Sequence, residues 1–126
     1  MQKTIIKTSQ APDPIGPYNQ AILINGQLFI SGQVCIDPAT GDLIKGDIKD
    51  ETRQVMKNLQ AILKEAGMDF SQVVKTTIFI TDMHQFASIN EVYGSYFTSD
   101  FPARETVQVS ALPKFVNVEI SMIAVQ

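Results

Sequence analysis

Apolar and polar residues alternate along several short segments of the chain, and this period of two is typical of strands that bury one face. Two apolar runs flank Asn25-Gly26 within residues 21–32. Because both positions of a two-residue hairpin turn favour positive φ, this dipeptide predicts a β-hairpin. Further strands are predicted at 4–7, 43–46 and 73–82, with two more between 101 and 125.

The period changes to that of an amphipathic helix in two longer segments. The first lies between a predicted N-cap at Asp47 and a stop at Gly67. Its inner stripe contains Val55, Leu59, Ile62, Leu63 and Ala66. The second is predicted to open at Asp82, because Gln85 three residues later completes a capping box. Its inner stripe contains Phe86, Ile89, Asn90, Tyr93 and Phe97.

The order of these elements is strands, helix, strand, helix and two strands, which favours an α+β fold with one mixed sheet and two helices on one face. The 126 residues are 44% hydrophobic, and this suits one domain over 1–126. The segment APDPIGPY contains three prolines and a glycine, so it is neither helix nor central strand. We expect an ordered loop or a lid there.

The stretch FPARETVQVSALPKFVNVEISMIAV predicts a final hairpin that turns near Leu112-Pro113. Strand alternation then places Arg104 and Glu119 on one face, as diagonal neighbours. The pattern alone favours a solvent-exposed ion pair, because antiparallel sheets commonly have one wet face. The alternative is that another subunit covers this face, since Ile123 and Val125 on it are apolar.

Charge and composition narrow the possible chemistry. The net charge is −3 and no basic run is present, which argues against nucleic-acid binding. The chain has one Cys and one His, so we expect no internal disulfide and no zinc site, and a His-based triad would have to use His84. No apolar run approaches the ~20 residues of a membrane helix, and the N-terminus lacks a secretory signal. These features predict a cytoplasmic protein.

Several segments carry a family resemblance. PARETVQVSALPKFVNVEI closely resembles the C-terminal signature of the RidA family, the reactive intermediate deaminases A, also called YjgF-type proteins. IGPYNQA, LFISGQ, VVKTTIFITDM and INEVYGSYF resemble other family segments in the same order. The resemblance covers nearly the whole chain.

The resemblance implies a chorismate-mutase-like fold, a homotrimer with active sites between subunits, and a reaction that needs no metal or organic cofactor. The implied reaction is hydrolysis of 2-aminoacrylate and 2-aminocrotonate, or their imine tautomers 2-iminopropanoate and 2-iminobutanoate, to 2-oxo acids and ammonia. Arg104 matches the family arginine that grips the substrate carboxylate, and a guanidinium fork suits that task. Glu119 matches the glutamate that positions or activates water. The other matching pocket positions are Tyr18, Ser31, Gly32, Asn90 and Thr106.

Each of these pocket positions also has a structural interpretation. Tyr18 could anchor the proline-rich loop, Ser31 and Gly32 could end a strand at a bulge, and Asn90 could make a structural hydrogen bond. Thr106 stands where some members carry cysteine, so we expect it to tune binding. Two other functions stay open: a trimer that binds small carboxylates without turning them over, and, with less support from the charge, a single-stranded RNA endoribonuclease.

Overall fold

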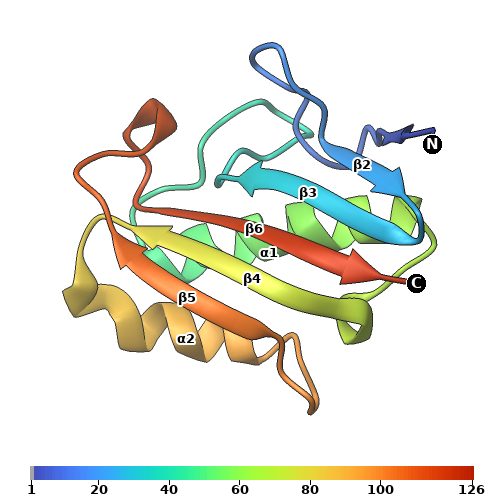
Figure 1. The fold of residues 1–126 in the computed structure, drawn as a ribbon. Coiled ribbons are helices and arrows are strands. Elements are labelled where there is room, and N and C mark those ends of the chain that lie inside the picture. The colour runs from blue at the N-terminus through green and yellow to red at the C-terminus, as the bar shows by residue number, and fades with distance from the viewer. Residues whose placement is uncertain (1) are drawn as a thin grey trace.

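The computed structural model describes residues 2–126 and contains one six-stranded sheet in the order β1-β2-β3-β6-β4-β5. Both α-helices pack on one face and leave the other face open (Figure 1), which confirms the predicted α+β architecture. The strands are β1 Thr4–Ile6, β2 Ala21–Ile24, β3 Gln27–Gln33, β4 Val73–Ile80, β5 Ala103–Gln108 and β6 Val118–Val125. The helices are α1 Ile48–Glu65, α2 Phe86–Gly94 and the short 3₁₀ turns η1 Phe70–Gln72, η2 Met83–Gln85 and η3 Pro113–Phe115.

The hairpin of β2 and β3 turns at Asn25-Gly26 as predicted. Asn25 has φ 51° and Gly26 has φ 74°, the left-handed values that a tight two-residue turn requires. Ala21 lies opposite Ile30 in the antiparallel register. The strand predicted at 43–46 is reduced to a single bridge between Ile36 and Leu43.

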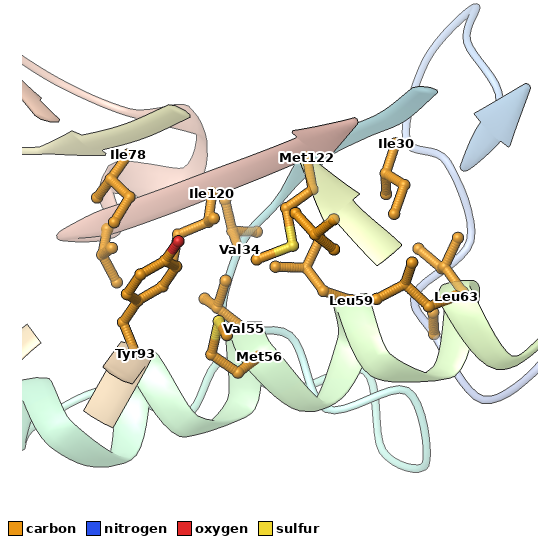
Figure 2. Packing of buried hydrophobic residues seen from close by; sticks show 14 of the residues in the cluster. Ile30, Val34, Val55, Met56, Leu59, Leu63, Ile78, Tyr93, Ile120 and Met122 are labelled. Atoms are coloured by element: carbon orange, nitrogen blue, oxygen red, sulfur yellow. The ribbon is translucent and has the colours of Figure 1, made fainter. Parts of the chain in front are cut away.

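Helix α1 begins and ends close to the predicted positions. The side chain of Asp47 accepts a hydrogen bond from the backbone N–H of Lys49, and Gly67 follows the helix with φ 73°. The apolar stripe of α1 packs against the sheet, where Val55 and Leu59 lie beneath Ile120 and Met122 (Figure 2). This layer is the core of the fold.

Helix α2 begins later than predicted. Asp82 caps the 3₁₀ turn η2 through the backbone N–H of His84, and α2 then starts after Gln85 without a side-chain cap. The capping box predicted for Asp82 and Gln85 is therefore wrong at this position. A capping box forms instead between Asp69 and Gln72 at η1.

The predicted final hairpin is also wrong. β5 pairs in parallel with β4, and β6 lies between β3 and β4, antiparallel to both. The segment between β4 and β5 contains α2, and such a crossover is what a parallel pair needs. β6 has hydrogen-bonding neighbours on both sides and an almost fully buried row, Val118, Ile120, Met122 and Ala124, as a central strand should. The more polar β5 occupies the edge.

In this topology the side chains of β5 point to the faces of the sheet opposite to those predicted. Arg104 is in register with Thr76, and Thr106 with Ile78, so both point toward the helices. Glu105 points to the open face, where it accepts a hydrogen bond from Thr77 and pairs with Lys75. The predicted hairpin had placed Glu105 on the apolar face that packs on the helices. The observed pairing of β5 explains why a carboxylate occurs at this position.

Candidate functional site

Arg104 is held by side chains of α2. Its Nη1 donates a 2.7 Å hydrogen bond to Oδ1 of Asn90, and its guanidinium lies 5.2 Å from the ring centre of Tyr93 and 5.6 Å from that of Phe86. Stacking against two rings fixes the plane of the guanidinium. A groove of about 380 Å³ opens beside it, between α2 and the segment Phe101–Pro102. We call this the arginine groove.

Tyr93 anchors the arginine groove to the sheet. Its hydroxyl donates a 2.9 Å hydrogen bond to Oγ1 of Thr76, and burial raises the pKa of Tyr93 above its ordinary value. The ring therefore stays neutral at physiological pH. A guanidinium has five N–H donors, and Asn90 is the acceptor that Arg104 finds among residues 2–126, so several donors are available to a ligand.

Glu119 lies in a different cavity, of about 360 Å³, formed by the proline-rich loop, the end of β3 and the start of β6. We call it the glutamate cavity. Burial raises the pKa of the Glu119 carboxyl, and no described residue donates a hydrogen bond to it or pairs with it. A half-buried carboxylate with an elevated pKa and unoccupied lone pairs is suited to binding and deprotonating a water molecule.

Gly32 makes room for the Glu119 carboxylate. A Cβ atom at position 32 would lie 2.8 Å from Cδ and 3.1 Å from Oε1 of Glu119, closer than such atoms approach. The register of β3 against β6 shifts between Ile30 and Gln33, so Gly32 sits in a bulge. The predicted bulge is confirmed, and its effect is to let the glutamate side chain lie across the strand.

Gln20 fixes the proline-rich loop over the glutamate cavity. This buried side chain accepts from the backbone N–H of Thr8 at 2.8 Å and donates to the carbonyls of Thr8, Ala11 and Pro12 at 2.9 to 3.2 Å. Tyr18 lines the same cavity, and its hydroxyl accepts a hydrogen bond from the backbone N–H of Ile15. These contacts connect both ends of the proline-rich segment, for which an ordered loop or a lid was expected, to the wall of the cavity.

The remaining predicted residues divide between internal contacts and the two concavities. Ser31 lines the glutamate cavity, but its hydroxyl donates a 2.6 Å hydrogen bond to the carbonyl of Asn19. Thr106 faces the helices, and its Oγ1 is shielded from solvent without a hydrogen-bond partner in the described chain. A ligand therefore does not reach that hydroxyl in this rotamer.

Arg104 and Glu119 do not share a face, contrary to the prediction. Glu119 is in register with Phe79 on the open face, whereas Arg104 is in register with Thr76 on the helix face. Three residues along the strands and two inter-strand spacings separate their Cα atoms by about 14 Å. The error follows from the hairpin, which made the two strands neighbours. One copy of the chain does not bring both groups around a small substrate.

Metal-ligating clusters, the thiol of Cys35 and membrane-spanning helices were also considered among the described residues. In the described part of the chain, no three His, Cys, Asp or Glu side chains gather as they would around a metal ion. Burial, with a smaller contribution from the charge of Glu51, raises the pKa of Cys35 to about 11, so this thiol is protonated and unreactive. Within residues 2–126, no helix has the length and apolar character needed to cross a membrane.

The profile of the family described as Endoribonuclease L-PSP matches residues 8–126. The 2-iminobutanoate/2-iminopropanoate deaminase of Homo sapiens is 47% identical, with 98% of this chain and 90% of the relative covered. Among solved structures, YyfA of Yersinia pestis, a protein of the conserved Rid family, has a TM-score of 0.97 at 52% identity, covering 99% of this chain and 100% of that one. TdcF of E. coli, crystallised with bound serine, has a TM-score of 0.94 at 42% identity, covering 98% of both chains.

The chain belongs to the RidA/YjgF family. This confirms the resemblance that the sequence motifs carry. Within the family fold, sequence reasoning missed the roles of Gln20, Phe86 and Tyr93 in shaping the two concavities. Gln20 belongs to the motif IGPYNQA, and both aromatic residues lie on the predicted inner stripe of α2. Gln20 directly precedes the apolar run of β2, and this position was the available signal for it.

Proposed function

We propose that this protein is a deaminase that hydrolyses 2-iminopropanoate and 2-iminobutanoate, the tautomers of 2-aminoacrylate and 2-aminocrotonate, to 2-oxo acids and ammonia. The relatives named as 2-iminobutanoate/2-iminopropanoate deaminases support this assignment. The observation that carries it is the Glu119 carboxyl, half-buried with a raised pKa and no internal donor. Such a group is suited to a reaction whose nucleophile is water.

The chemistry requires few protein groups. The substrate is a protonated imine whose carbon is already electrophilic, and Arg104 would bind its carboxylate through two parallel N–H donors. Glu119 takes a proton from water as the water oxygen bonds to the imine carbon. The resulting carbinolamine receives the proton at nitrogen. As the C–N bond breaks and ammonia leaves, the Glu119 carboxylate takes the hydroxyl proton of the carbinolamine and the carbonyl forms. An elevated pKa suits Glu119 both to accept and to return this proton.

We propose further that the working form is a homotrimer in which the arginine groove of one subunit meets the glutamate cavity of the next. The separation of Arg104 and Glu119 within one chain supports this, because both groups must reach one small substrate. The open face of the sheet also carries apolar side chains, and Phe29, Val107 and Val125 are about 40% exposed. Burying such a patch between copies is favourable. The proposed reaction takes place in the cytoplasm.

The activity is tested by coupling the protein to a threonine dehydratase with semicarbazide present to trap free imine. We expect 2-oxobutanoate to form faster with the wild type than with Arg104→Ala. Equal rates would remove the enzymatic assignment. Light scattering of the purified protein tests the trimer independently, and a monomeric mass at micromolar concentration would contradict it.

A non-catalytic carboxylate-binding trimer is the second candidate, and the serine bound to TdcF of E. coli favours it. This function requires Arg104 but not Glu119. Calorimetric titration of serine or a 2-oxo acid into Glu119→Gln separates the candidates when read beside turnover. Unchanged affinity together with a wild type that lacks turnover would favour binding alone.

RNA cleavage is the third candidate, and the description of the family as an endoribonuclease motivates it. The net charge of −3 gives little attraction to a phosphate backbone. Cleavage of single-stranded RNA by nuclease-free protein, and its loss in Arg104→Ala, would establish this activity.

A further inference from the structure

Glu51 is a buried carboxylate that belongs to neither the arginine groove nor the glutamate cavity. It lies in the first turn of α1, its exposed fraction is 0%, and it pairs with no described cation. Removing a carboxylate from water is costly unless it gains strong hydrogen bonds. Its partners therefore show what the burial achieves.

The hydrogen bonds that the described residues donate to the Glu51 carboxylate come from Asn117 and Val118, where the chain enters β6. Oε2 accepts from the backbone N–H of Asn117 at 2.7 Å and from that of Val118 at 3.1 Å. Oε1 accepts from the side-chain amide of Asn117 at 3.0 Å. The residue after Val118 is Glu119, so the carboxylate holds the backbone directly next to the proposed water-activating group.

Asn117 is held from a second side by the end of β4. The backbone N–H of Thr81 donates to the carbonyl of Asn117 at 3.2 Å, and the hydroxyl of Thr81 approaches its Oδ1 at 3.3 Å. The segment before it is irregular, because Lys114 and Phe115 both have left-handed φ near 55°. Regular pairing of β6 with β4 begins only at Val118. The contacts of Asn117 therefore set where the strand starts.

We infer that Glu51 is a positioning residue for Glu119, acting as an acceptor clamp on the backbone of Asn117 and Val118. This rests on the proposed deaminase function for its catalytic consequence. The clamp joins α1, in the helix layer, to the start of β6. Glu119 projects from the opposite face of that strand. Loss of the clamp lets the strand start shift, and a shift of about 1 Å at a catalytic group costs up to about 10²-fold in rate.

The required property is hydrogen-bond acceptance rather than charge, and this makes the inference testable. Glu51→Gln keeps an oxygen that can accept from both backbone N–H groups. The side-chain amide of Asn117 can turn over, so that its Oδ1 accepts from the new amide and its Nδ2 donates to the hydroxyl of Thr81. Glu51→Met has similar length but accepts no strong hydrogen bond, so both N–H groups are left buried and unpaired. Thr52→Val is the matched control, because Thr52 is equally buried in α1 and its hydroxyl donates only to Ile48 within the helix.

We expect Glu51→Met to lower kcat about tenfold or more, with KM changed less than about threefold, while Glu51→Gln and Thr52→Val stay within about twofold of wild type. The second measurement does not depend on turnover: the Glu119 carboxyl is titrated by ¹³C NMR and assigned with Glu119→Gln. Asp13 and Tyr18 line the same cavity and are followed in the same titration. The Glu119 titration should move toward lower pH in Glu51→Met only.

Three results would overturn the inference. One is a folded Glu51→Met that matches Thr52→Val in both kcat and the Glu119 titration. Another is an equal loss of kcat in Glu51→Gln and Glu51→Met, because charge would then be the property that matters. The third is a loss in Glu51→Met with an unshifted Glu119 titration. A wild type without turnover would remove the proposed function, and the NMR comparison would still decide the clamp.

Exchanging the carboxylate and the amide between positions 51 and 117 keeps the test decisive if Glu51→Met fails to fold. Asn117→Asp places a second carboxylate 3.0 Å from Oε1 of Glu51, where an amide now donates, and should lower kcat and shift the Glu119 titration. Adding Glu51→Gln restores a hydrogen bond between the two side chains with its direction reversed, because the amide at position 51 now donates to the carboxylate at position 117. The side-chain oxygen at position 51 still accepts from both backbone N–H groups. The double variant should recover wild-type values. A folded double variant that remains as impaired as Asn117→Asp would overturn the clamp.

Discussion

Asn90 accepts a 2.7 Å hydrogen bond from Nη1 of Arg104 and so holds the guanidinium in the arginine groove. The helix residue and the edge-strand residue are brought together by the crossover from β4 through α2 to β5. A cation fixed by one acceptor and two aromatic rings is preorganised, and less entropy is lost when it binds a carboxylate. The role of Asn90 is thus to orient the arginine, whether or not it also touches a ligand.

Asn90→Ala should therefore weaken substrate binding. A hydrogen bond to a charged group contributes about 1.5–3 kcal/mol, which corresponds to roughly a 10- to 100-fold rise in KM if all of it serves binding. The change in kcat should be smaller, because Glu119 is untouched. Steady-state kinetics in the dehydratase-coupled assay measure both constants. Ser88→Ala, in the same helix and outside the groove, is the control. A KM of Asn90→Ala equal to that of Ser88→Ala would refute the orienting role.

Gly32→Ala should impair the water-activating group without touching the arginine. The added Cβ would meet the Glu119 carboxyl at 2.8 Å, so the carboxyl must move outward toward solvent. Since burial is what raises the pKa of Glu119, the variant should have a lower pKa there. The acid limb of the kcat profile should shift to lower pH, and kcat should fall about tenfold or more.

The pH profile of kcat for wild type and Gly32→Ala measures this effect. Gly16→Ala is a matched control near the same cavity, because its Cβ would contact the ring of Tyr18 at an ordinary 3.7 Å. An unshifted acid limb in Gly32→Ala would show that the glycine does not govern the Glu119 environment.

Glu119→Gln should abolish most activity and yet stabilise the fold at neutral pH. The folded-state pKa of Glu119 is raised above its ordinary value, so the charged form opposes folding. This cost is fully present above the folded pKa and disappears as the pH falls below the unfolded value near 4.5. The Tm of Glu119→Gln should exceed that of wild type at pH 8, and the difference should shrink toward pH 4.

Glu105→Gln provides a control of opposite sign. Its hydrogen bond from Thr77, with a further contribution from Lys75, lowers the pKa of Glu105, so its charged form favours folding. That contribution is present above the unfolded pKa and is lost as the pH falls through the folded one. Calorimetric Tm values between pH 4 and pH 8 compare both variants. A Glu119→Gln variant less stable than wild type at pH 8 would contradict the desolvation argument.

Local signals in the sequence predict the local parts of this fold. Asn25-Gly26 identifies the hairpin, and Asp47 with Gly67 delimits α1, because each acts on its own backbone. The pairing of β5 lies beyond such signals. Strand alternation tells which residues share a face but not which strand is the neighbour, and Leu112-Pro113 resembles a hairpin turn although β6 inserts between β3 and β4.

The candidate site shows the same division. Arg104 and Glu119 are identifiable from motif, yet their relative placement depends on the pairing that alternation does not determine. Glu51 carried a usable signal, since it lies four residues before Val55 on the inner stripe of α1. A carboxylate at a core position of a helix predicts a buried acceptor, and only the tertiary structure identifies Asn117 and Val118 as its donors.

Thr106→Val tests whether Thr106 contributes to the reaction through its side-chain hydroxyl. Oγ1 of Thr106 is shielded from solvent and has no described partner, so replacing it with a methyl group of similar size removes an unsatisfied polar atom. The variant should gain about 1 kcal/mol, or about 3–5 °C in Tm. Its kcat and KM should stay within about twofold of wild type. Thermal unfolding and coupled kinetics measure these effects.

Thr76→Val is the contrast. Oγ1 of Thr76 accepts a hydrogen bond from the hydroxyl of Tyr93, so the loss of this oxygen should lower Tm. A drop in kcat/KM of tenfold or more in Thr106→Val would mean that the hydroxyl rotates toward the substrate during the reaction.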